Sequence, residues 1–223
     1  MSCFNGIMQE YRDLSLDRFD GRNLKSSMFF LSHCHADHMV GLDSGELAEH
    51  LRINPHVRLV CSDVTSGLLL AITRFKHLRP SILTLPIDEE QLLEIGYHPD
   101  TLHLSVTLIP AGHCPGSVMF LIKGDQGNVL YTGDFRFAVG ETVRLNSLFS
   151  RTKSYELRSP IKSVYVDTTF CVPEALHIPS REDCKQHIIT TISDWFTREG
   201  SRIAHVFSRS SYGYEYLMTE IAR

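Results

Sequence analysis

Three histidines and an aspartate stand within six consecutive residues, directly after an apolar stretch that ends at Leu31. The run extends from Ser32 to His38 and reads Ser-His-Cys-His-Ala-Asp-His. Because side chains two apart on a strand point to the same side, His33 and His35 are placed to act together. Imidazole nitrogen and carboxylate oxygen are ligands that zinc prefers. The run predicts a hydrolytic metal site at the end of a strand, in which Asp37 and His38 face a second metal. The alternative is a polar loop with surface histidines.

Two later turns carry residues of the same kind. His113 lies in a glycine- and proline-rich turn, residues 110–117, and Asp134 follows the apolar stretch that ends at Tyr131. Taken alone, the histidine is typical of a structural turn and the Gly-Asp pair of an ordinary loop. Catalytic metals often draw ligands from loops at one edge of a sheet, so the first run makes both residues candidate remote ligands.

Composition limits the class of protein. The chain has 223 residues, 43% of them hydrophobic and 22% charged, which is typical of a globular protein with one large domain or slightly more. Its net charge of −4 means that nucleic-acid binding needs a local basic face. We expect no signal peptide, no membrane contact and reduced cysteines. Cys34 and Cys114 flank candidate ligands, and we expect each to pack as a small apolar residue.

Hydrophobic periodicity predicts an α+β layered sandwich in the first part of the chain. The expected strands lie at 14–19, 28–31, 57–62, 104–109, 118–123 and 129–132, and the expected helices at 38–51 and 62–77. Residues 136–162 then form a polar, basic stretch, which we expect to be loop-like. It either lines a groove for a nucleic-acid backbone or is simply a solvated charged loop.

The last third of the chain alternates between strand and helix patterns. The pattern predicts a buried strand at 164–166 that ends at Asp167, a helix at 180–198, a strand at 203–207 and a helix from Tyr214. Such an order is typical of a parallel α/β module. An aspartate at a strand end can cap the following turn, and this structural role for Asp167 is as consistent with the pattern as a functional one.

Longer motifs give a more specific result. The segments that carry it are Ser15–Asp20, Phe30–His35, Leu108–Phe120, Val129–Arg136, Ser163–Phe170 and Tyr212–Leu217. Together they resemble the DNA-repair branch of the metallo-β-lactamase/β-CASP nucleases, across nearly the whole chain. The resemblance implies the N-terminal half of a metallo-β-lactamase αββα sandwich at 1–155. It also implies the beginning of an inserted, truncated α/β β-CASP module at 156–223.

The resemblance also implies roles for individual residues. His33, His35 and His113 would hold a first zinc, and Asp134 would bridge to a second site. That second site would be completed by Asp37 and His38, and would take Zn²⁺, Mg²⁺ or Mn²⁺. The resemblance counts four carboxylates as catalytic: Asp37, Asp134, Asp17 and Asp167. Among these, Asp17 would steady a ligand histidine, Asp167 would support the site from the insert, and Asp37 or Asp134 would orient the water.

The implied function is a zinc-dependent DNA nuclease of the nucleus, with 5′-exonuclease and hairpin-opening, structure-specific endonuclease activity. It would act on overhangs, hairpins and ends in non-homologous end joining and V(D)J-type recombination. Its partners would be a DNA-dependent protein kinase and end-joining ligase factors. Two alternatives stay open: an RNA-processing β-CASP nuclease, and a truncated, inactive isoform that binds metal or partners.

Overall fold

The computed structural model describes residues 4–96, 101–150, 156–197, 203–208 and 210–223. The chain divides into unit 1, Met1–Asp167, and unit 2, Thr168–Arg223. The division falls later than residue 155, the predicted boundary, because a strand at Ser163–Tyr165 pairs with the sheet of unit 1. The assignment of the two parts to a half sandwich and an insert stays a prediction.

Unit 1 contains two sheets. Sheet A has four parallel strands in the order β1 (Leu14–Leu16), β2 (Met28–Phe30), β3 (Arg58–Cys61) and β4 (Ile82–Thr84). Sheet B has the order β5 (Glu90–Ile95), β6 (Leu102–Pro110), β7 (Val118–Lys123), β8 (Val129–Tyr131) and β9 (Ser163–Tyr165). Its first four strands are antiparallel, and β9 joins β8 in parallel. The α+β class is thus confirmed.

The main core lies between the two sheets. Alternate residues of the strands point into it, because successive side chains of a strand face opposite sides. Phe30 of β2 meets Phe120 of β7 edge-on, with ring centroids 5.1 Å apart, and both rings are fully buried. The same core takes Leu14 and Leu16 from sheet A and Val106 from sheet B.

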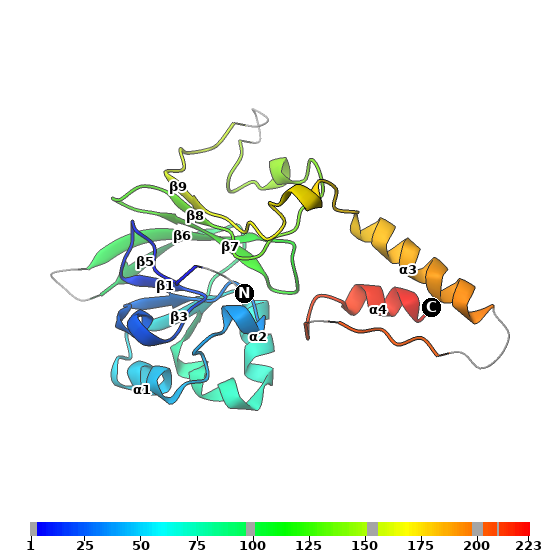
Figure 1. Cartoon of the computed structure of the whole chain (residues 1–223). Coiled ribbons are helices and arrows are strands. Elements are labelled where there is room, and N and C mark those ends of the chain that lie inside the picture. The colour runs from blue at the N-terminus through cyan, green and yellow to red at the C-terminus, as the bar shows by residue number, and fades with distance from the viewer. Residues whose placement is uncertain (1–3, 97–100, 151–155, 198–202, 209) are drawn as a thin grey trace. The chain divides into compact units, whose positions relative to one another are not determined.

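Helices cover the other face of sheet A. These are α1 (Gly45–Ile53) and α2 (Asp63–Ala71), with 3-10 helices at Gly21–Lys25, Ala36–His38 and Thr73–Ser81 (Figure 1). Ser44 and Ser62 cap α1 and α2 by accepting backbone hydrogen bonds. The helix predicted to start at His38 therefore begins only at Gly45. The one predicted to reach His77 changes to 3-10 geometry after Ile72, whose backbone is extended.

The basic stretch after Asp134 covers the outer face of sheet B and includes a 3-10 helix, Thr142–Arg144. The stretch is loop-like as predicted, but it is not simply solvated, since its apolar residues pack on this face. The second cluster contains Ile109, Ala111, Met119, Leu121, Leu130 and Leu148, with Phe135, Phe137, Leu145, Phe149 and Ile161 against it. In the part of the chain that the structure describes, this segment stands where a second helical layer was expected.

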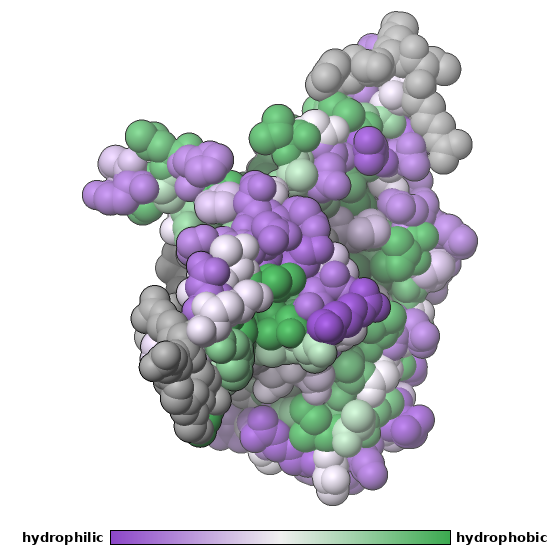
Figure 2. Space-filling view, turned by 90° about the vertical axis from the view of Figure 1, so that its right-hand side faces the viewer, coloured by the Kyte–Doolittle hydropathy of each residue, from purple (hydrophilic) through white to green (hydrophobic). Residues whose placement is uncertain are grey.

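Unit 2 contains a 3-10 helix at Pro173–Ala175 and the helices α3 (Arg181–Phe196) and α4 (Glu215–Ile221). Ser180 caps α3 by accepting a hydrogen bond from the backbone N–H of Asp183. The strand predicted at 203–207 is wrong within the described residues, where no strand of unit 2 lies beside it to pair. Hydrophobic residues of this unit, Leu176 and Phe207 among them, are exposed, and Figure 2 shows hydrophobic patches among polar surface.

One smaller expectation also changes. Val164 of β9 is 52% exposed and is not buried as predicted, because β9 is an edge strand. Among the described residues, none of the helices is both long and apolar enough for a transmembrane span.

Candidate metal centre

The candidate ligands gather where four strands of unit 1 end or turn. His33 and His35 follow β2, and His38 ends the 3-10 helix Ala36–His38. His113 lies in the turn between β6 and β7, and Asp134 follows β8. The structure thus brings together side chains that are about 100 residues apart in the sequence, as the two later turns predicted.

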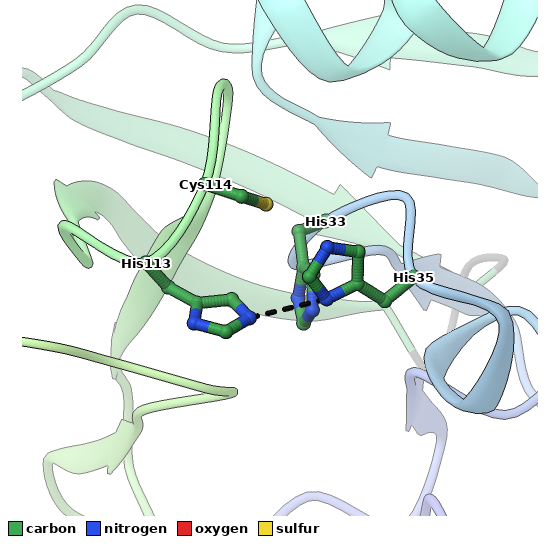
Figure 3. Close-up of side chains that lie close together, drawn as sticks. All are labelled: His33, His35, His113 and Cys114. Atoms are coloured by element: carbon green, nitrogen blue, oxygen red, sulfur yellow. Dashed lines mark hydrogen bonds between the residues drawn. The ribbon is translucent and has the colours of Figure 1, made fainter. Parts of the chain in front are cut away.

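Two groups of donor atoms form within the described residues. The first is His33, His35, His113 and Cys114, and the second is His33, His38 and Asp134; within each group all donor atoms lie within 4.8 Å of one another. Figure 3 shows the side chains of the first group pointing toward one another, with His113 Nε2 3.1 Å from His35 Nδ1. Asp134 lies between the groups, because its Oδ2 is 3.5 Å from His113 Nε2 and its Oδ1 3.1 Å from His38 Nε2.

The buried His33 side chain tests whether these residues fit a metal ion. His33 is fully buried, and its Nδ1 lies 2.9 Å from Ser32 Oγ. Its Nε2 is buried without a hydrogen-bond partner. A buried polar atom without a partner costs free energy, and a lone pair directed into a ring of imidazoles and carboxylate is a ready ligand for a cation. The donor set therefore fits a divalent ion such as zinc.

Asp37 was predicted to face a second metal, but its side chain lies at the rim of the centre. Its side chain is 42% exposed, and its Oδ2 lies 3.9 Å from His38 Nε2. It belongs to neither donor group as the structure describes them. Its position at the rim leaves the carboxylate open to water.

Asp17 holds both ends of the histidine run by hydrogen bonds to Ser32 and His38. Its Oδ1 accepts a 2.7 Å hydrogen bond from Ser32 N, and its Oδ2 accepts from Ser32 Oγ, Tyr131 Oη and His38 Nδ1. The bond to Nδ1, 2.8 Å long, turns His38 Nε2 toward Asp134. A carboxylate that holds the remote nitrogen of a ligand histidine is the usual partner in zinc sites. This geometry supports the role predicted for Asp17.

The ionisation of these groups follows from burial and from their neighbours. Burial opposes the charge of Asp17, but the hydrogen bond and charge of His38 outweigh it and hold the Asp17 pKa below its usual value. Burial likewise opposes the charge on His38, and hydrogen bonds to Asp134 and Asp17 prevail, raising its pKa to about 10. Burial, with the charge of His38, lowers the His33 pKa to about 3. His33 is thus neutral at pH 7, as a metal ligand must be.

Asp167 lies beside the centre without joining a donor group in the described residues. Its backbone N–H donates a 3.0 Å hydrogen bond to Thr132 Oγ1, which places it next to the strand that delivers Asp134. Its charge is near enough to act on the His113 pKa, which burial nevertheless lowers. A supporting role for Asp167 stays a prediction.

Two glycines allow the loops around the metal centre to lie close to neighbouring side chains. Gly133 has a φ of +50°, and a Cβ there would lie 2.8 Å from Ser32 Oγ. Gly116 has a φ of +79°, and a Cβ would lie 2.7 Å from Thr65 Oγ1. Both positions therefore require a residue without a side chain. The turn is further fixed because Ser117 Oγ accepts from the backbone N–H groups of His113 and Cys114.

The sequence reasoning missed four residues of this centre. Ser32, Tyr131 and Ser117 hold the ligands in place, and Cys114 contributes a donor atom. The position of Ser32 at the head of the run was a usable signal. Tyr131 carried no such signal, because its contact with Asp17 joins residues 114 positions apart. Cys34 is buried as expected, whereas Cys114 is only partly buried.

Comparison with known proteins adds relatives that span the whole chain. No family model matches. The chain is 42% identical over 224 residues to protein artemis from Homo sapiens and 44% identical to that from Mus musculus, in each case over 100% of this chain. It is 35% identical over 222 residues, 98% of this chain, to 5′ exonuclease Apollo from Rattus norvegicus. It spans about a third of these relatives, covering 32%, 31% and 36% of their lengths.

Solved structures overlap with shorter parts of the chain. The metallo-beta-lactamase fold protein YhfI from Bacillus subtilis gives a TM-score of 0.37 at 17% identity, covering 56% of this chain and 47% of that one. Zn²⁺-bound PqqB from Methylobacterium extorquens gives 0.34 at 18% identity, covering 48% and 33%. The resemblance found in the sequence is confirmed by the relatives: this chain is similar to protein artemis over its whole length and to 5′ exonuclease Apollo over 98% of it.

Proposed function

We propose that this chain carries the metal centre of a zinc-dependent DNA nuclease, a phosphodiester hydrolase with 5′-exonuclease and structure-specific, hairpin-opening endonuclease activity. The unpartnered, fully buried His33 Nε2, surrounded by His35, His113 and Asp134, is the observation that carries the proposal. Similarity to relatives whose names include an exonuclease supports DNA as the substrate.

A divalent ion supplies Lewis acidity at such a centre: it acidifies water and offsets charge on a phosphodiester. Zinc is the proposed ion for the imidazole-rich group, and zinc, Mg²⁺ or Mn²⁺ for the group that includes Asp134. The burial of His33 excludes bulk water from one side of the centre. Asp37, exposed at the rim, is placed to accept a proton from the attacking water and orient it. Asp17 keeps His38 directed at the site through its Nδ1 hydrogen bond.

The six basic residues of the segment 136–162 are proposed to contact the DNA backbone: Arg136, Arg144, Arg151, Lys153, Arg158 and Lys162. Two of the six are engaged within the fold, because Arg158 Nε donates to Phe149 O and Lys162 Nζ to Gln126 O. Arg151 and Lys153 lie outside the described residues. Arg144, exposed on the 3-10 helix Thr142–Arg144, is the best test position. Arg144→Glu should make the affinity for DNA fall less steeply with salt concentration, by about one released counterion. An unchanged slope would contradict a DNA-binding groove in this segment.

In the cell, the proposed role is the trimming of overhangs, hairpins and ends in non-homologous end joining and V(D)J-type recombination in the nucleus. The proposed partners are DNA, a DNA-dependent protein kinase and end-joining ligase factors. Unit 2 would then be the beginning of a β-CASP insert. These points rest on similarity to relatives about three times as long as this chain.

The test combines zinc stoichiometry with cleavage of 5′-labelled hairpin and overhang DNA. His35→Ala and Asp37→Ala should abolish cleavage. His77→Ala serves as control, because this exposed histidine lies on the helix Thr73–Ser81 and bonds only locally to Arg74 O. Full activity in His35→Ala would refute the site.

Two alternatives are tested by adding single-stranded RNA to the substrates of the same experiment. An RNA-processing nuclease would cleave single-stranded RNA in preference to every DNA substrate. A non-catalytic protein that binds metal or partners would hold zinc but cleave neither. Each outcome would replace the proposed function.

A further inference from the structure

We propose that Tyr131 is a positioning residue of the second donor group. Acting through Asp17, its hydroxyl holds His38 at the distance from Asp134 that lets both bind one ion. The proposal deepens the proposed metal-dependent function and rests on it. It also divides the support of the centre, because each of the two donor groups then has its own link between sheet A and sheet B.

The first step is the hydrogen bond between Tyr131 and Asp17. The Tyr131 side chain is buried, and its Oη donates a 2.8 Å hydrogen bond to Asp17 Oδ2, because an ionised carboxylate only accepts. Burial and the charge of Asp17 raise the pKa of Tyr131 well above its usual value of 10, so the donor proton stays in place. Among the described residues, the Asp17 side chain takes its other hydrogen bonds from Ser32 and His38, which both follow β2 of sheet A. Tyr131 therefore links Asp17 to sheet B.

The second step is a closed ring of contacts around the second donor group. Asp17 Oδ2 accepts a 2.8 Å hydrogen bond from His38 Nδ1, and His38 Nε2 lies 3.1 Å from Asp134 Oδ1. Asp134 follows Tyr131, the last residue of β8, by three residues. The ring thus leaves Tyr131 through its side chain and returns to it through the backbone. The phenol therefore acts on the spacing of His38 and Asp134, which are both members of the ring.

The first donor group has a separate link between the sheets. At the start of β7, Val118 N donates a 3.1 Å hydrogen bond to Ser32 O, which directly precedes His33. One residue before Val118, Ser117 Oγ accepts from the backbone N–H of His113. These bonds join the loop that carries His33 to the turn that carries His113, without involving the phenol. Removing the phenol oxygen should therefore leave the first group in place.

Packing offers a rival explanation for the spacing of the second group. A Cβ on Gly133 would stand 2.8 Å from Ser32 Oγ, so the loop after β8 already lies against the loop after β2. The Tyr131 ring also packs against Phe4 and Phe120, with ring centroids 5.5 Å and 6.5 Å apart. If these contacts alone set the spacing, the hydroxyl would contribute nothing to metal binding. Tyr131→Phe keeps the ring and the glycine, so this variant separates the two explanations.

Zinc titration of the metal-free chain, with a competing chelator to set the free ion, tests the proposal. We expect two binding steps in the unmodified chain. Tyr131→Phe should leave the first affinity unchanged and weaken the second about tenfold or more. Tyr11→Phe is the matched control, because Tyr11 is also buried and its Oη donates a 2.6 Å hydrogen bond to Gly127 O, outside both donor groups. The control lowers the urea midpoint of unfolding but should leave both affinities unchanged.

A double-mutant cycle with Asp17→Asn tests the route of the effect. Because the effect runs through the Asp17 carboxylate, Tyr131→Phe should weaken the second ion clearly less in the Asp17→Asn background. In cleavage of 5′-labelled overhang DNA, Tyr131→Phe should lower kcat at limiting zinc and leave KM unchanged, since it changes the metal centre and not the surface that binds DNA.

An unchanged second affinity in Tyr131→Phe, an equal loss in both steps, or a single step in the unmodified chain would overturn the proposal. So would equal effects in the two backgrounds, a raised KM with kcat unchanged, or failure of this variant alone to fold. Absence of zinc binding by the unmodified chain would refute the proposed metal centre, and this proposal with it. Two bound zinc ions without cleavage would refute the proposed nuclease, and the two affinities would then decide the role of Tyr131.

Discussion

Replacing Asp17 with asparagine is the sharpest perturbation of this centre, because it removes one charge and leaves the shape unchanged. Asp17 has a φ of +51°, in the left-handed region that asparagine also tolerates, so the backbone is not put under new strain. The side chain is 3% exposed and accepts four hydrogen bonds. Any loss of stability therefore reports the charge and these bonds alone.

The magnitude follows from the four bonds. An amide oxygen at the Oδ2 position keeps the bonds from Ser32 Oγ, Tyr131 and His38, but loses their charge assistance, which roughly doubles such bonds. The amide nitrogen then faces Ser32 N–H, a buried donor left without an acceptor, at about 1–3 kcal/mol. Together these effects predict a loss of about 3–5 kcal/mol, in the range found for breaking buried ion pairs.

The assay is urea unfolding of the metal-free chain, together with zinc affinity by competition with a chelator. We expect zinc binding to weaken about 10- to 100-fold, because His38 loses its orienting partner. Asp20→Asn is the matched control: this carboxylate is 37% exposed and pairs with Arg18, so the change should cost less than about 1 kcal/mol. Asp17→Asn with the stability and zinc affinity of the control would refute the reasoning.

Three further changes test the fold around the site, each by urea unfolding. Gly133→Ala should cost about 1–3 kcal/mol, since φ is +50° and the new methyl group meets Ser32 Oγ. Phe30→Ala should cost about 3–5 kcal/mol, because it opens a cavity between the sheets. Glu10 accepts hydrogen bonds from Ser163 and Tyr165; these outweigh the opposing effect of burial and lower its pKa below 4.5. Its stabilisation is thus complete above pH 4.5 and lost as pH falls through the lowered pKa, so Glu10→Gln should reduce acid sensitivity.

Matched variants separate the causes. Gly140→Ala also has a positive φ, +83°, but its methyl group meets nothing within 4 Å, so it should cost less than Gly133→Ala. Phe30→Leu should cost clearly less than Phe30→Ala, and Glu46→Gln, on the exposed surface of α1, should leave the acid response unchanged. Equal costs within either of the first two pairs, or an unchanged acid response in Glu10→Gln, would contradict the corresponding explanation.

The sequence predicted most of the centre because its ligands follow strands with strong signals. The apolar stretches before Ser32, at 104–109 and before Gly133 became β2, β6 and β8, and the polar residues after them met. β6 and β8 run in the same direction on either side of β7, so their carboxyl ends lie at one edge of sheet B, and a strand pattern that ends in ligands constrains the site as well as the sheet.

What the sequence could not predict depends on tertiary contact. The bond from Tyr131 to Asp17 joins the two sheets, and no local pattern reveals it. The segment 136–162 looked polar because its few aromatic residues, such as Phe137 and Phe149, are spaced irregularly, yet they cover sheet B. The pattern at 203–207 is favourable for a strand, but a strand also needs a neighbour to supply hydrogen bonds.

The shared position of His33 has a consequence for how metal is loaded. His33 appears in both donor groups and offers one ligand atom, and the lone pair of a single nitrogen bonds to one ion at a time. Two ions therefore compete for this nitrogen, and whichever group binds first leaves the other with a smaller set of ligands. Filling the imidazole-rich group first would leave His38 and Asp134, with Asp37 at the rim, for the second ion. Metal uptake should accordingly be stepwise, with one tightly held ion and one that exchanges with the surrounding solution.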